Sequence, residues 1–586
     1  HVVCLLLVQT HRLKYLRYAI INIEINMSSF NIKNHKNDLL FIPLGGSNEI
    51  GMNFNLYHYK GKWLIIDCGR GFADDYLPGV DMMIADSSFI EKHKKDIVGM
   101  IITHAHEDHL GGVQYLWNSL KCPIYTTTFT ANFLKIRLSE YDFAKNIKIH
   151  EVTPGGKIDL APFSLEMVPL THSAPEMQAI MIRTEAGNIL HTGDWKFDND
   201  PVLGKKADEE LLKSYGDEGV LALVCDSTNV FNKGSSGSEG DVRKSLVDII
   251  AGCPQMVVVS TFASNLARLD TIIHAAQLAG RKVALTGRSL HRIKLAAEES
   301  GYFKDIAPLI SERDVSRFRR EELLIIATGC QGEPLAATAK LASNSHQSIK
   351  LAPKDTMIFS SKIIPGNEKK IFRLFNIFVK SGVEVITERD HFVHVSGHPS
   401  VDELQKMYSL IRPNICIPVH GEPVHIHEHV KLAKKNGIKQ AVEVENGSVV
   451  LLEPNNAKVI AKVESGYLAV DGNYLLPVES PIFKARRRMR ESGIVIASIV
   501  IDQKGLLAAK PILSMPGLLD ANEDMQLINI IKNDIAELIK TQQSQANKAL
   551  SKEQIEEKIK STIRKTLKQE INKSPAIIVN IEKAIE

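Results

Sequence analysis

One stretch of sequence decides the fold class of this chain: Ile101-Ile102-Thr103-His104-Ala105-His106-Glu107-Asp108-His109-Leu110-Gly111-Gly112. An apolar run ends at Thr103, and three histidines and two acids follow it almost at once. Imidazole nitrogens and carboxylate oxygens are the ligands that suit Zn²⁺. His104 and His106 point the same way because side chains alternate along an extended segment, whereas Asp108 and His109 lie further on and can serve a neighbouring ion. The stretch therefore predicts a metal site at the exit of a buried strand.

Further candidate ligands follow other apolar runs of the chain. They occur in three short segments: Thr171-His172-Ser173, His191-Thr192-Gly193-Asp194, and Pro418-Val419-His420-Gly421-Glu422. A single histidine or aspartate at such a place is more often structural than catalytic. Their shared position after predicted strands makes them candidates for the same site.

The pattern of apolar residues changes twice along the chain. Strand-like runs begin at residue 38, and from about residue 231 to residue 370 strands alternate with helices, which predicts a parallel α/β domain inserted into the first. The earlier pattern then returns up to about residue 458. Beyond it, two helical stripes and flanking strands predict a small α+β domain.

Length and charge limit what this protein does. A chain of 586 residues is too long for one hydrophobic core. A net charge of +3 is low for a protein that binds nucleic acid over its whole surface, so any such contact must be local. The seven cysteines contain no CxxC pair and are odd in number, which predicts reduced, buried thiols.

The first residues do not look like a targeting segment. The apolar run Val2–Val8 is far shorter than the ~20 residues that span a bilayer, and it lacks the flanks of a signal peptide. The chain starts with histidine, and Met27 precedes a polar stretch, so we interpret residues 1–26 as an over-extended reading frame. We expect residues 1–37 to be a disordered or non-native extension and the protein to be cytoplasmic.

Taken together, these motifs resemble the ribonuclease J family, which belongs to the β-CASP subgroup of the metallo-β-lactamase superfamily. The resemblance covers about residues 38–586. Besides the histidine motif, it is carried by Asp226-Ser227-Thr228-Asn229, Ser238-Glu239-Gly240, Thr261-Phe262-Ala263-Ser264-Asn265, Thr328-Gly329-Cys330-Gln331-Gly332-Glu333-Pro334, His394-Val395-Ser396-Gly397-His398 and Pro418-Val419-His420-Gly421-Glu422.

The resemblance implies an α/β fold: a metallo-β-lactamase αββα sandwich with an inserted β-CASP α/β domain and a small C-terminal α+β domain. We expect the metallo-β-lactamase domain in two parts, residues 38–230 and 371–458. The β-CASP domain would span residues 231–370, and a linker with the C-terminal domain would span residues 459–586.

The resemblance also assigns the metal ligands. One zinc ion would be held by His104, His106 and His172, and a second by Asp108, His109 and His420, with Asp194 bridging the two. Asp67 would orient ligands without binding metal. The resemblance implies two Zn²⁺ per chain, with Mn²⁺ or Mg²⁺ as possible replacements.

Further residues are assigned to catalysis and to RNA. Asp226 and Glu239 match the first acidic motif of the β-CASP domain, and His398 matches its second motif, beside the scissile phosphate. Asp108 is a candidate for proton transfer. Candidates for contacts with phosphate or RNA are Ser264, Arg288, Ser360, Ser361, His394, Ser396 and Gly397.

The implied activity is hydrolysis of RNA phosphodiester bonds. Two zinc ions ~3.5–4 Å apart would lower the pKa of a water molecule to about 7 and make it nucleophilic. The resemblance implies a 5′→3′ exonuclease that prefers a 5′-monophosphate end, with endonuclease activity, in ribosomal RNA maturation and messenger RNA decay. It also implies a homodimer or homotetramer. The basic run Lys484-Ala485-Arg486-Arg487-Arg488-Met489-Arg490 is either an RNA contact or a solvated helix face.

Two other functions remain open from the residues. A metallohydrolase of small thioesters or lactams would share the histidine motif, although such enzymes are compact. An inactive RNA-binding scaffold would have lost ligands, whereas this chain keeps all seven.

Overall fold

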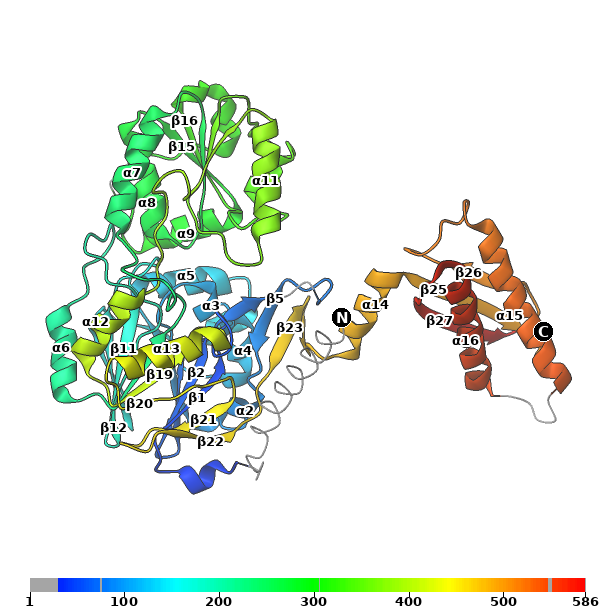
Figure 1. Cartoon of the computed structure of the whole chain (residues 1–586), viewed down its shortest axis with the longest axis horizontal. Helices are drawn as coiled ribbons and strands as arrows, with labels where there is room; N and C mark the ends of the chain where they lie inside the picture. The colour runs from blue at the N-terminus through cyan, green and yellow to red at the C-terminus, as the bar shows by residue number, and fades with distance from the viewer. Residues whose placement is uncertain (1–29, 74–75, 305, 546–550, 585–586) are drawn as a thin grey trace, which may run out of the picture. The chain divides into compact units, whose positions relative to one another are not determined.

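A computed structural model describes residues 30–73, 76–304, 306–545 and 551–584 (Figure 1). They form two compact units, the first comprising residues up to 71 and residues 84–466, and the second comprising residues 72–83 and residues from 467 onward. Our expectation for residues 1–37 lies mostly outside the described residues. Within that range, Ile32–His35 form a short 3₁₀ helix, η1.

The first unit is built on two sheets. One has eight strands in the order β22-β21-β1-β2-β3-β6-β7-β8. Their bounds are β1 Leu40–Gly45, β2 Phe54–Tyr59, β3 Lys62–Ile66, β6 Ile97–Ile101, β7 Ile124–Thr126, β8 Ile149–Glu151, β21 Ser448–Leu451 and β22 Lys458–Lys462. The other has seven strands in the order β20-β19-β13-β12-β11-β10-β9. Their bounds are β9 Lys157–Leu160, β10 Phe163–Pro169, β11 Gln178–Thr184, β12 Gly187–His191, β13 Ala222–Asp226, β19 Ile415–Val419 and β20 Gln440–Ala441.

The two sheets pack face to face over one hydrophobic core. Phe41, Tyr57 and Ile66 from the eight-stranded sheet join Phe163 and Ile182 from the seven-stranded sheet in a single buried cluster. Every residue of β1 is buried, as expected for a strand inside a layered fold. The helices of this sandwich are α2 Ser88–Glu91, α3 Glu107–Leu110, α4 Val113–Leu120, α5 Thr128–Leu138, α6 Glu209–Glu218, α12 Val401–Ile411 and α13 Pro423–Lys435. The αββα sandwich is therefore confirmed.

A separate parallel sheet interrupts the sandwich between β13 and β19. These two strands are neighbours in the seven-stranded sheet although the whole inserted domain separates them in sequence. The inserted sheet has the order β15-β16-β14-β17-β18. Its bounds are β14 Val257–Ser260, β15 Lys282–Thr286, β16 Leu323–Ala327, β17 Thr356–Phe359 and β18 Glu384–Ile386, with helices α7 Glu239–Gly252, α8 Leu266–Leu278, α9 Arg288–Glu299, α10 Ala337–Ala342 and α11 Glu368–Lys380.

The inserted sheet continues beyond the boundary that we placed at residue 370. That residue lies inside α11, and β18 pairs in parallel with β17 after it. The strand was not recognised because it has only three residues, the first of them exposed. A parallel strand needs a crossover helix, and α11 provides it.

The second unit contains the predicted α+β domain. Its sheet has the order β26-β25-β27, and its elements are α14 Pro481–Ser492, β25 Ile494–Ile501, β26 Ile512–Ser514, α15 Met525–Gln545, α16 Lys552–Ile571 and β27 Ala576–Lys583. Burial alternates along β25 because one face of this sheet packs on α15 and α16. A hairpin of β23 Tyr467–Asp471 and β24 Tyr474–Pro477 precedes it in sequence. Among the described residues, no helix is both long enough and apolar enough to span a bilayer.

Candidate metal centre

The predicted ligands come from the segments that follow four strands of the sandwich, and two of them, Asp108 and His109, lie in the short helix α3. His104 to His109 follow β6, and His172 follows β10. Asp194 follows β12, and His420 follows β19. Strands from both sheets thus deliver their polar ends to one place, while their apolar residues fill the core between the sheets.

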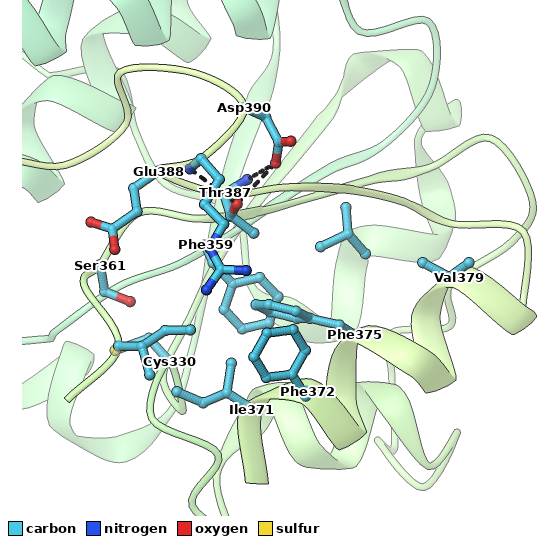
Figure 2. A pocket seen from close by; sticks show the side chains of 13 residues that line it. Cys330, Phe359, Ser361, Ile371, Phe372, Phe375, Val379, Thr387, Glu388 and Asp390 are labelled. Atoms are coloured by element: carbon cyan, nitrogen blue, oxygen red, sulfur yellow. Dashed lines mark hydrogen bonds between the residues drawn. The ribbon is translucent and has the colours of Figure 1, made fainter. Parts of the chain in front are cut away.

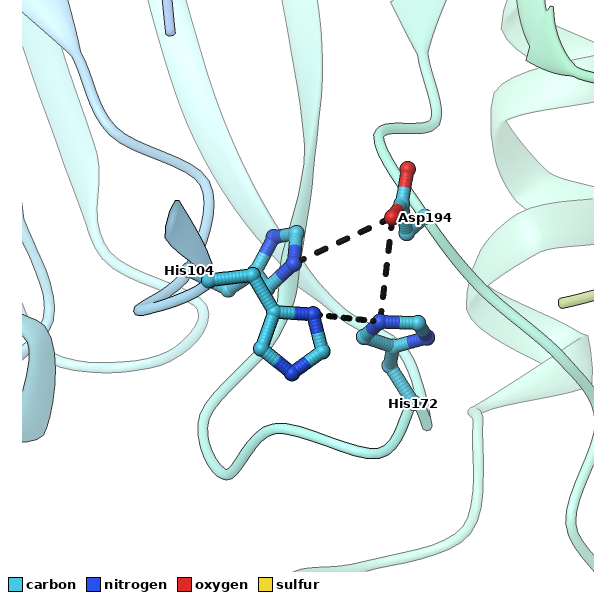
Figure 3. A group of neighbouring side chains, drawn as sticks. His104, His172 and Asp194 are labelled. Carbon is cyan, nitrogen blue, oxygen red and sulfur yellow. Dashed lines mark hydrogen bonds and ion pairs between the residues drawn. The ribbon is translucent and has the colours of Figure 1, made fainter. Parts of the chain in front are cut away.

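One group of four side chains can hold a cation. It comprises His104, His106, His172 and Asp194, whose ligand atoms all lie within 4.8 Å of one another. Asp194 Oδ2 lies 4.0 Å from His104 Nε2 and 3.7 Å from His172 Nε2 (Figure 3). His172 Nε2 also lies 3.1 Å from His106 Nδ1. These separations suit three imidazoles that converge on one ion.

A second group shares the same aspartate. Asp108, His109, Asp194 and His420 also lie within 4.8 Å by their ligand atoms. Asp194 Oδ2 is 3.1 Å from His109 Nε2 and 3.5 Å from His420 Nε2. Asp108 Oδ2 is 3.4 Å from His420 Nε2. Asp194 therefore lies between two ligand groups, as a bridging carboxylate would.

Three contacts orient the imidazoles from behind. His109 Nδ1 lies 2.7 Å from Asp67 Oδ2, and Asp67 also accepts a hydrogen bond from the Thr103 amide. His104 Nδ1 lies 3.0 Å from Thr103 Oγ1. His172 Nδ1 donates to the carbonyl of Gly397 at 2.7 Å. Each bond places a proton on Nδ1 or holds that atom in place, which leaves Nε2 facing the cluster.

The buried polar atoms of the cluster fit divalent cations. Among the described residues, the partnerless buried atoms include His104 Nε2, His106 Nε2, Asp194 Oδ1 and both ring nitrogens of His420. Buried polar atoms are nearly always paired, and bound cations would supply partners for those of these atoms that face the cluster. Nitrogen and carboxylate donors of this kind favour zinc.

Electrostatics support the same conclusion. Burial, and then the neighbouring imidazoles, hold the pKa of His104 and of His172 below the ordinary value, so both rings are neutral and offer lone pairs. Burial lowers the pKa of His109, but the charges of Asp194, Asp67 and Asp108 outweigh it and raise that pKa well above the usual range. Three carboxylates thus act on the His109 ring, and a bound cation would take the place of the proton that they attract.

His398 lies beside the cluster and carries its own carboxylate. His398 Nδ1 is 2.7 Å from Asp226 Oδ2 and 3.9 Å from Asp194 Oδ2. Burial lowers the pKa of His398, but Asp226 and Asp194 outweigh it and raise that pKa to about 9. The ring is therefore protonated at neutral pH, which suits contact with a phosphate or with a leaving oxygen.

Glu239, which we expected to have a catalytic role, is not a member of either ligand group. Its carboxylate is bound by the guanidinium of Arg268, with Oε1 2.5 Å from Nε and Oε2 2.9 Å from Nη2. Both side chains are buried, so the pair stabilises the interface of α7 with α8. A buried carboxylate needs such a partner, and the catalytic role of Glu239 stays a prediction.

The expected RNA-contacting residues fall into two sets. Ser360, Ser396, Gly397 and His394 lie in or against the segment that carries His398. Ser264 lies in the loop between β14 and α8, and Arg288 is exposed at the first turn of α9. No ligand contact is present to test either set, so their roles stay predictions.

Ser361 lines a separate cavity in the inserted domain. Figure 2 shows this cavity, about 240 Å³ in volume, beside α11 and the end of β17. Its walls include Phe359, Phe372 and Phe375, with Cys330 next to Ser361. The apolar walls favour packing over phosphate binding by this serine.

Two arginines in the basic run of α14 make contacts with other residues of the second unit. Arg486 makes two hydrogen bonds to Asp471, at 2.9 and 2.7 Å. Arg487 lies over the ring of Tyr76, 5.7 Å from its centroid. At least these two arginines therefore have structural contacts, which favours the structural alternative to an RNA contact.

Sequence reasoning missed Arg268 and the orienting carbonyl of Gly397. Arg268 is fully buried and lies between apolar residues of α8, so a charge on that apolar face was the available signal. A backbone carbonyl leaves no signal in sequence. The cysteines behave as predicted: none of the six described ones forms a disulfide, and five of them are buried.

The sandwich and its two-group His/Asp centre define a metallohydrolase of the metallo-β-lactamase superfamily, and the family model of that name matches residues 53–249. Three further models match: "Ribonuclease J, beta-CASP domain" at residues 254–378, "Zn-dependent metallo-hydrolase RNA specificity domain" at residues 382–444, and "Ribonuclease J C-terminal domain" at residues 482–584. The chain belongs to the ribonuclease J family.

Similar proteins extend this match over nearly the whole chain. Ribonuclease J of Sinorhizobium meliloti is 37% identical over 550 residues, which cover 93% of this chain and 97% of that protein. Ribonuclease J of Corynebacterium glutamicum is 35% identical, covering 85% of this chain and 71% of that protein. Ribonuclease J of Helicobacter pylori is 32% identical, covering 93% and 80%. The family assignment made from the sequence motifs is therefore confirmed.

Proposed function

We propose that the chain is a zinc-dependent ribonuclease that binds two zinc ions and hydrolyses RNA phosphodiester bonds. It acts as a 5′→3′ exonuclease on 5′-monophosphate ends, with endonuclease activity in addition, in ribosomal RNA maturation and messenger RNA decay. We also propose that it works in the cytoplasm as a homodimer or homotetramer. The observation that carries the proposal is the convergence of six further ligand side chains on Asp194, in a chain of this family.

The residues supply two sites for zinc. His104, His106 and His172 would hold one ion, and Asp108, His109 and His420 the other, with Asp194 shared. When bound, a zinc pair supplies Lewis acidity and lowers the pKa of water to about 7. Manganese or magnesium could replace zinc in these two sites. Both ions prefer oxygen ligands, so they would bind fewer of the histidine nitrogens than zinc does.

Other side chains prepare the centre for the reaction. Asp67 holds His109, and the Gly397 carbonyl holds His172, so the imidazoles keep their orientation throughout. His398 keeps its proton because Asp226 accepts from Nδ1. Its Nε2 then contacts a phosphate oxygen or donates a proton to the leaving ribose oxygen.

A single RNA with three different 5′ ends tests the proposal. The same sequence is prepared with a 5′-monophosphate, a 5′-triphosphate or a 5′-hydroxyl, and each is incubated with the zinc-loaded protein. We expect stepwise release of mononucleotides from the monophosphate form, slower or internal cleavage of the others, and loss of all cleavage with a chelator.

The matched control is the Asp194→Ala variant, which removes the shared ligand while leaving the core unchanged. It should cleave none of the three RNAs. Release of nucleotides from the 3′ end, or hydrolysis of small esters without any cleavage of RNA, would contradict the proposal.

A further inference from the structure

Arg268 makes an unusually complete set of contacts for a residue that touches no ligand of the cluster. Its guanidinium pairs with Glu239, as described above. Its Nη1 also donates to Ser360 Oγ at 2.7 Å, to the Ser360 carbonyl at 3.1 Å and to the Val393 carbonyl at 3.0 Å. The side chain is fully buried. Arg268 therefore joins α7 and α8 to the end of β17 and to the segment that follows β18.

That segment, residues 393–398, is the loop that reaches the metal centre. It starts at Val393, where Arg268 binds, and ends at His398, where Asp226 binds. Just before that end, the Gly397 carbonyl accepts the hydrogen bond from His172 Nδ1. The 393–398 loop thus sets the positions of one candidate metal ligand, His172, and of the His398 imidazole beside the cluster.

The two ends of the 393–398 loop are held from different domains. Asn229, in the loop after β13 of the sandwich, donates to Ser396 Oγ at 2.7 Å and to the His398 carbonyl at 3.1 Å. Arg268 holds the other end from the inserted domain, and Ser360 Oγ reinforces it with a bond to the same Val393 carbonyl at 2.8 Å. A loop that is fixed at only one end could shift along its length.

We propose that Arg268 is a positioning residue, which fixes the 393–398 loop so that Gly397 orients His172 and His398 faces the reacting phosphate. This rests on the proposed function. Only arginine has a rigid planar fork that binds a carboxylate on one edge and two carbonyls and a hydroxyl on another. Glu239 holds the guanidinium of Arg268 in the required orientation. In this proposal Glu239 therefore acts on the reaction indirectly, through Arg268 and the 393–398 loop.

The competing explanation is that the Arg268–Glu239 pair only holds α7 against α8. A double variant, Arg268→Met with Glu239→Met, separates the two explanations. It removes both buried charges together and fills the space with apolar side chains, a change that buried ion pairs often tolerate. It therefore keeps the helices packed while it removes the anchor of Val393.

Hydrogen exchange on the full chain measures how firmly the 393–398 loop is held. This measurement does not depend on RNA cleavage. In the double variant we expect faster exchange in peptides that cover residues 393–398, with α7 and α8 exchanging as in the unmodified protein. With RNA as substrate, we expect kcat to fall about 10- to 100-fold and KM to change little, because a small displacement of reacting groups is costly. For the Arg268→Lys variant we expect loop exchange and kcat between those of the unmodified protein and those of the double variant.

The control is the neighbouring pair Arg243 and Asp270, which also joins α7 to α8 but makes no bond to the 393–398 loop among those the structure describes. The variant Arg243→Met with Asp270→Asn should leave loop exchange and kcat unchanged. Unchanged loop exchange and kcat in the double variant of Arg268 and Glu239 would overturn the proposal. Should that protein fail to fold, unchanged loop exchange and kcat in Arg268→Lys would overturn it equally.

These measurements also separate this inference from the proposed function. An unmodified protein that binds zinc but cleaves no RNA would contradict the proposed function alone. Faster loop exchange in the variant would still support the contact network, whereas normal exchange with full RNA cleavage would reject the role of Arg268 alone.

Discussion

At the residue scale, the centre uses backbone conformations that residues other than glycine seldom adopt. Asp67 has a φ of 64° and His420 a φ of 53°. Each such conformation costs about 1–3 kcal/mol and persists only where its surroundings hold it. The Asp67 amide donates to the Ile101 carbonyl, and the His420 amide donates to the Gly46 carbonyl. The strained backbone at Asp67 and His420 thus lowers the stability of the folded protein at two positions whose side chains belong to the centre.

Gly397 provides the sharpest residue-scale prediction. A Cβ at this position would lie 2.7 Å from both Cε1 and Nδ1 of His172. The Gly397→Ala variant must therefore move the loop or the imidazole, and we expect zinc affinity to fall about 10- to 100-fold, as for other losses of an orienting contact. Competition with a chromogenic chelator measures this affinity. Gly252→Ala is the control, since its Cβ would meet nothing within 4 Å, and equal affinities for the two variants would contradict the account.

At the element scale, α7 begins at a buried ionic cap that also supports the centre. Asp198 accepts from Ser238 Oγ at 2.6 Å and from the Glu239 amide at 3.0 Å. Its Oδ2 lies 2.9 Å from Lys196 Nζ, and both side chains are almost fully buried. Lys196 itself follows the strand end that carries Asp194. The cap therefore ties the inserted domain to the segment that carries Asp194, the candidate bridging carboxylate.

The cap predicts a pH-dependent loss of stability in an Asp198→Asn variant. Burial raises the pKa of Asp198, but Lys196 and the bonds from Ser238 and the Glu239 amide outweigh it and lower that pKa. A group with a depressed folded pKa stabilises above its unfolded value, about 3.9, and this contribution disappears as the pH falls. We expect the variant to lose about 1–2 kcal/mol at pH 7, in the range of a helix cap.

Thermal unfolding at a series of pH values measures the effect. The difference in melting temperature between the two proteins should narrow as the pH falls below about 4, because the unfolded chain then binds a proton at Asp198 that the folded protein binds only at lower pH. A difference that stays constant from neutral to acidic pH would mean that charge plays no part in this cap.

Most elements could be predicted from sequence because their apolar patterns are strong. The runs that became β1 and β16 are continuous and buried, and that of β6 is buried except at Val98. The stripes that became α15 and α16 have helical spacing. β18 was not predicted because a strand of three residues is too short to show an alternating pattern of apolar and polar residues. The candidate ligands could be proposed from sequence for a similar reason, since each follows such a run within a few residues. The Arg268–Val393 and His172–Gly397 contacts join residues far apart in sequence, and backbone carbonyls carry no sequence signal.

At the scale of the whole molecule, the two compact units have separate cores. The core of the second unit contains Val495, Ile535, Ile563 and Val579, and all of its members come from residues 495–581. The candidate ligands all belong to the first unit. Ligands stabilise only the part that binds them, so zinc should act on the first unit alone.

Calorimetry of the full chain tests this separation. Ile563 is fully buried, and Ile563→Ala should destabilise the second unit by about 2–5 kcal/mol. We expect this variant to shift one unfolding transition and a chelator to shift the other. A single transition that responds equally to both changes would contradict the separation.

The central claim is that Asp194 lies between two zinc ions held by six further side chains. The most direct measurement is an anomalous difference map at the zinc absorption edge from crystals of the zinc-loaded protein. We expect two peaks about 3.5–4 Å apart, one beside His104, His106 and His172 and the other beside Asp108, His109 and His420. A single peak, or two peaks that do not flank Asp194, would contradict it.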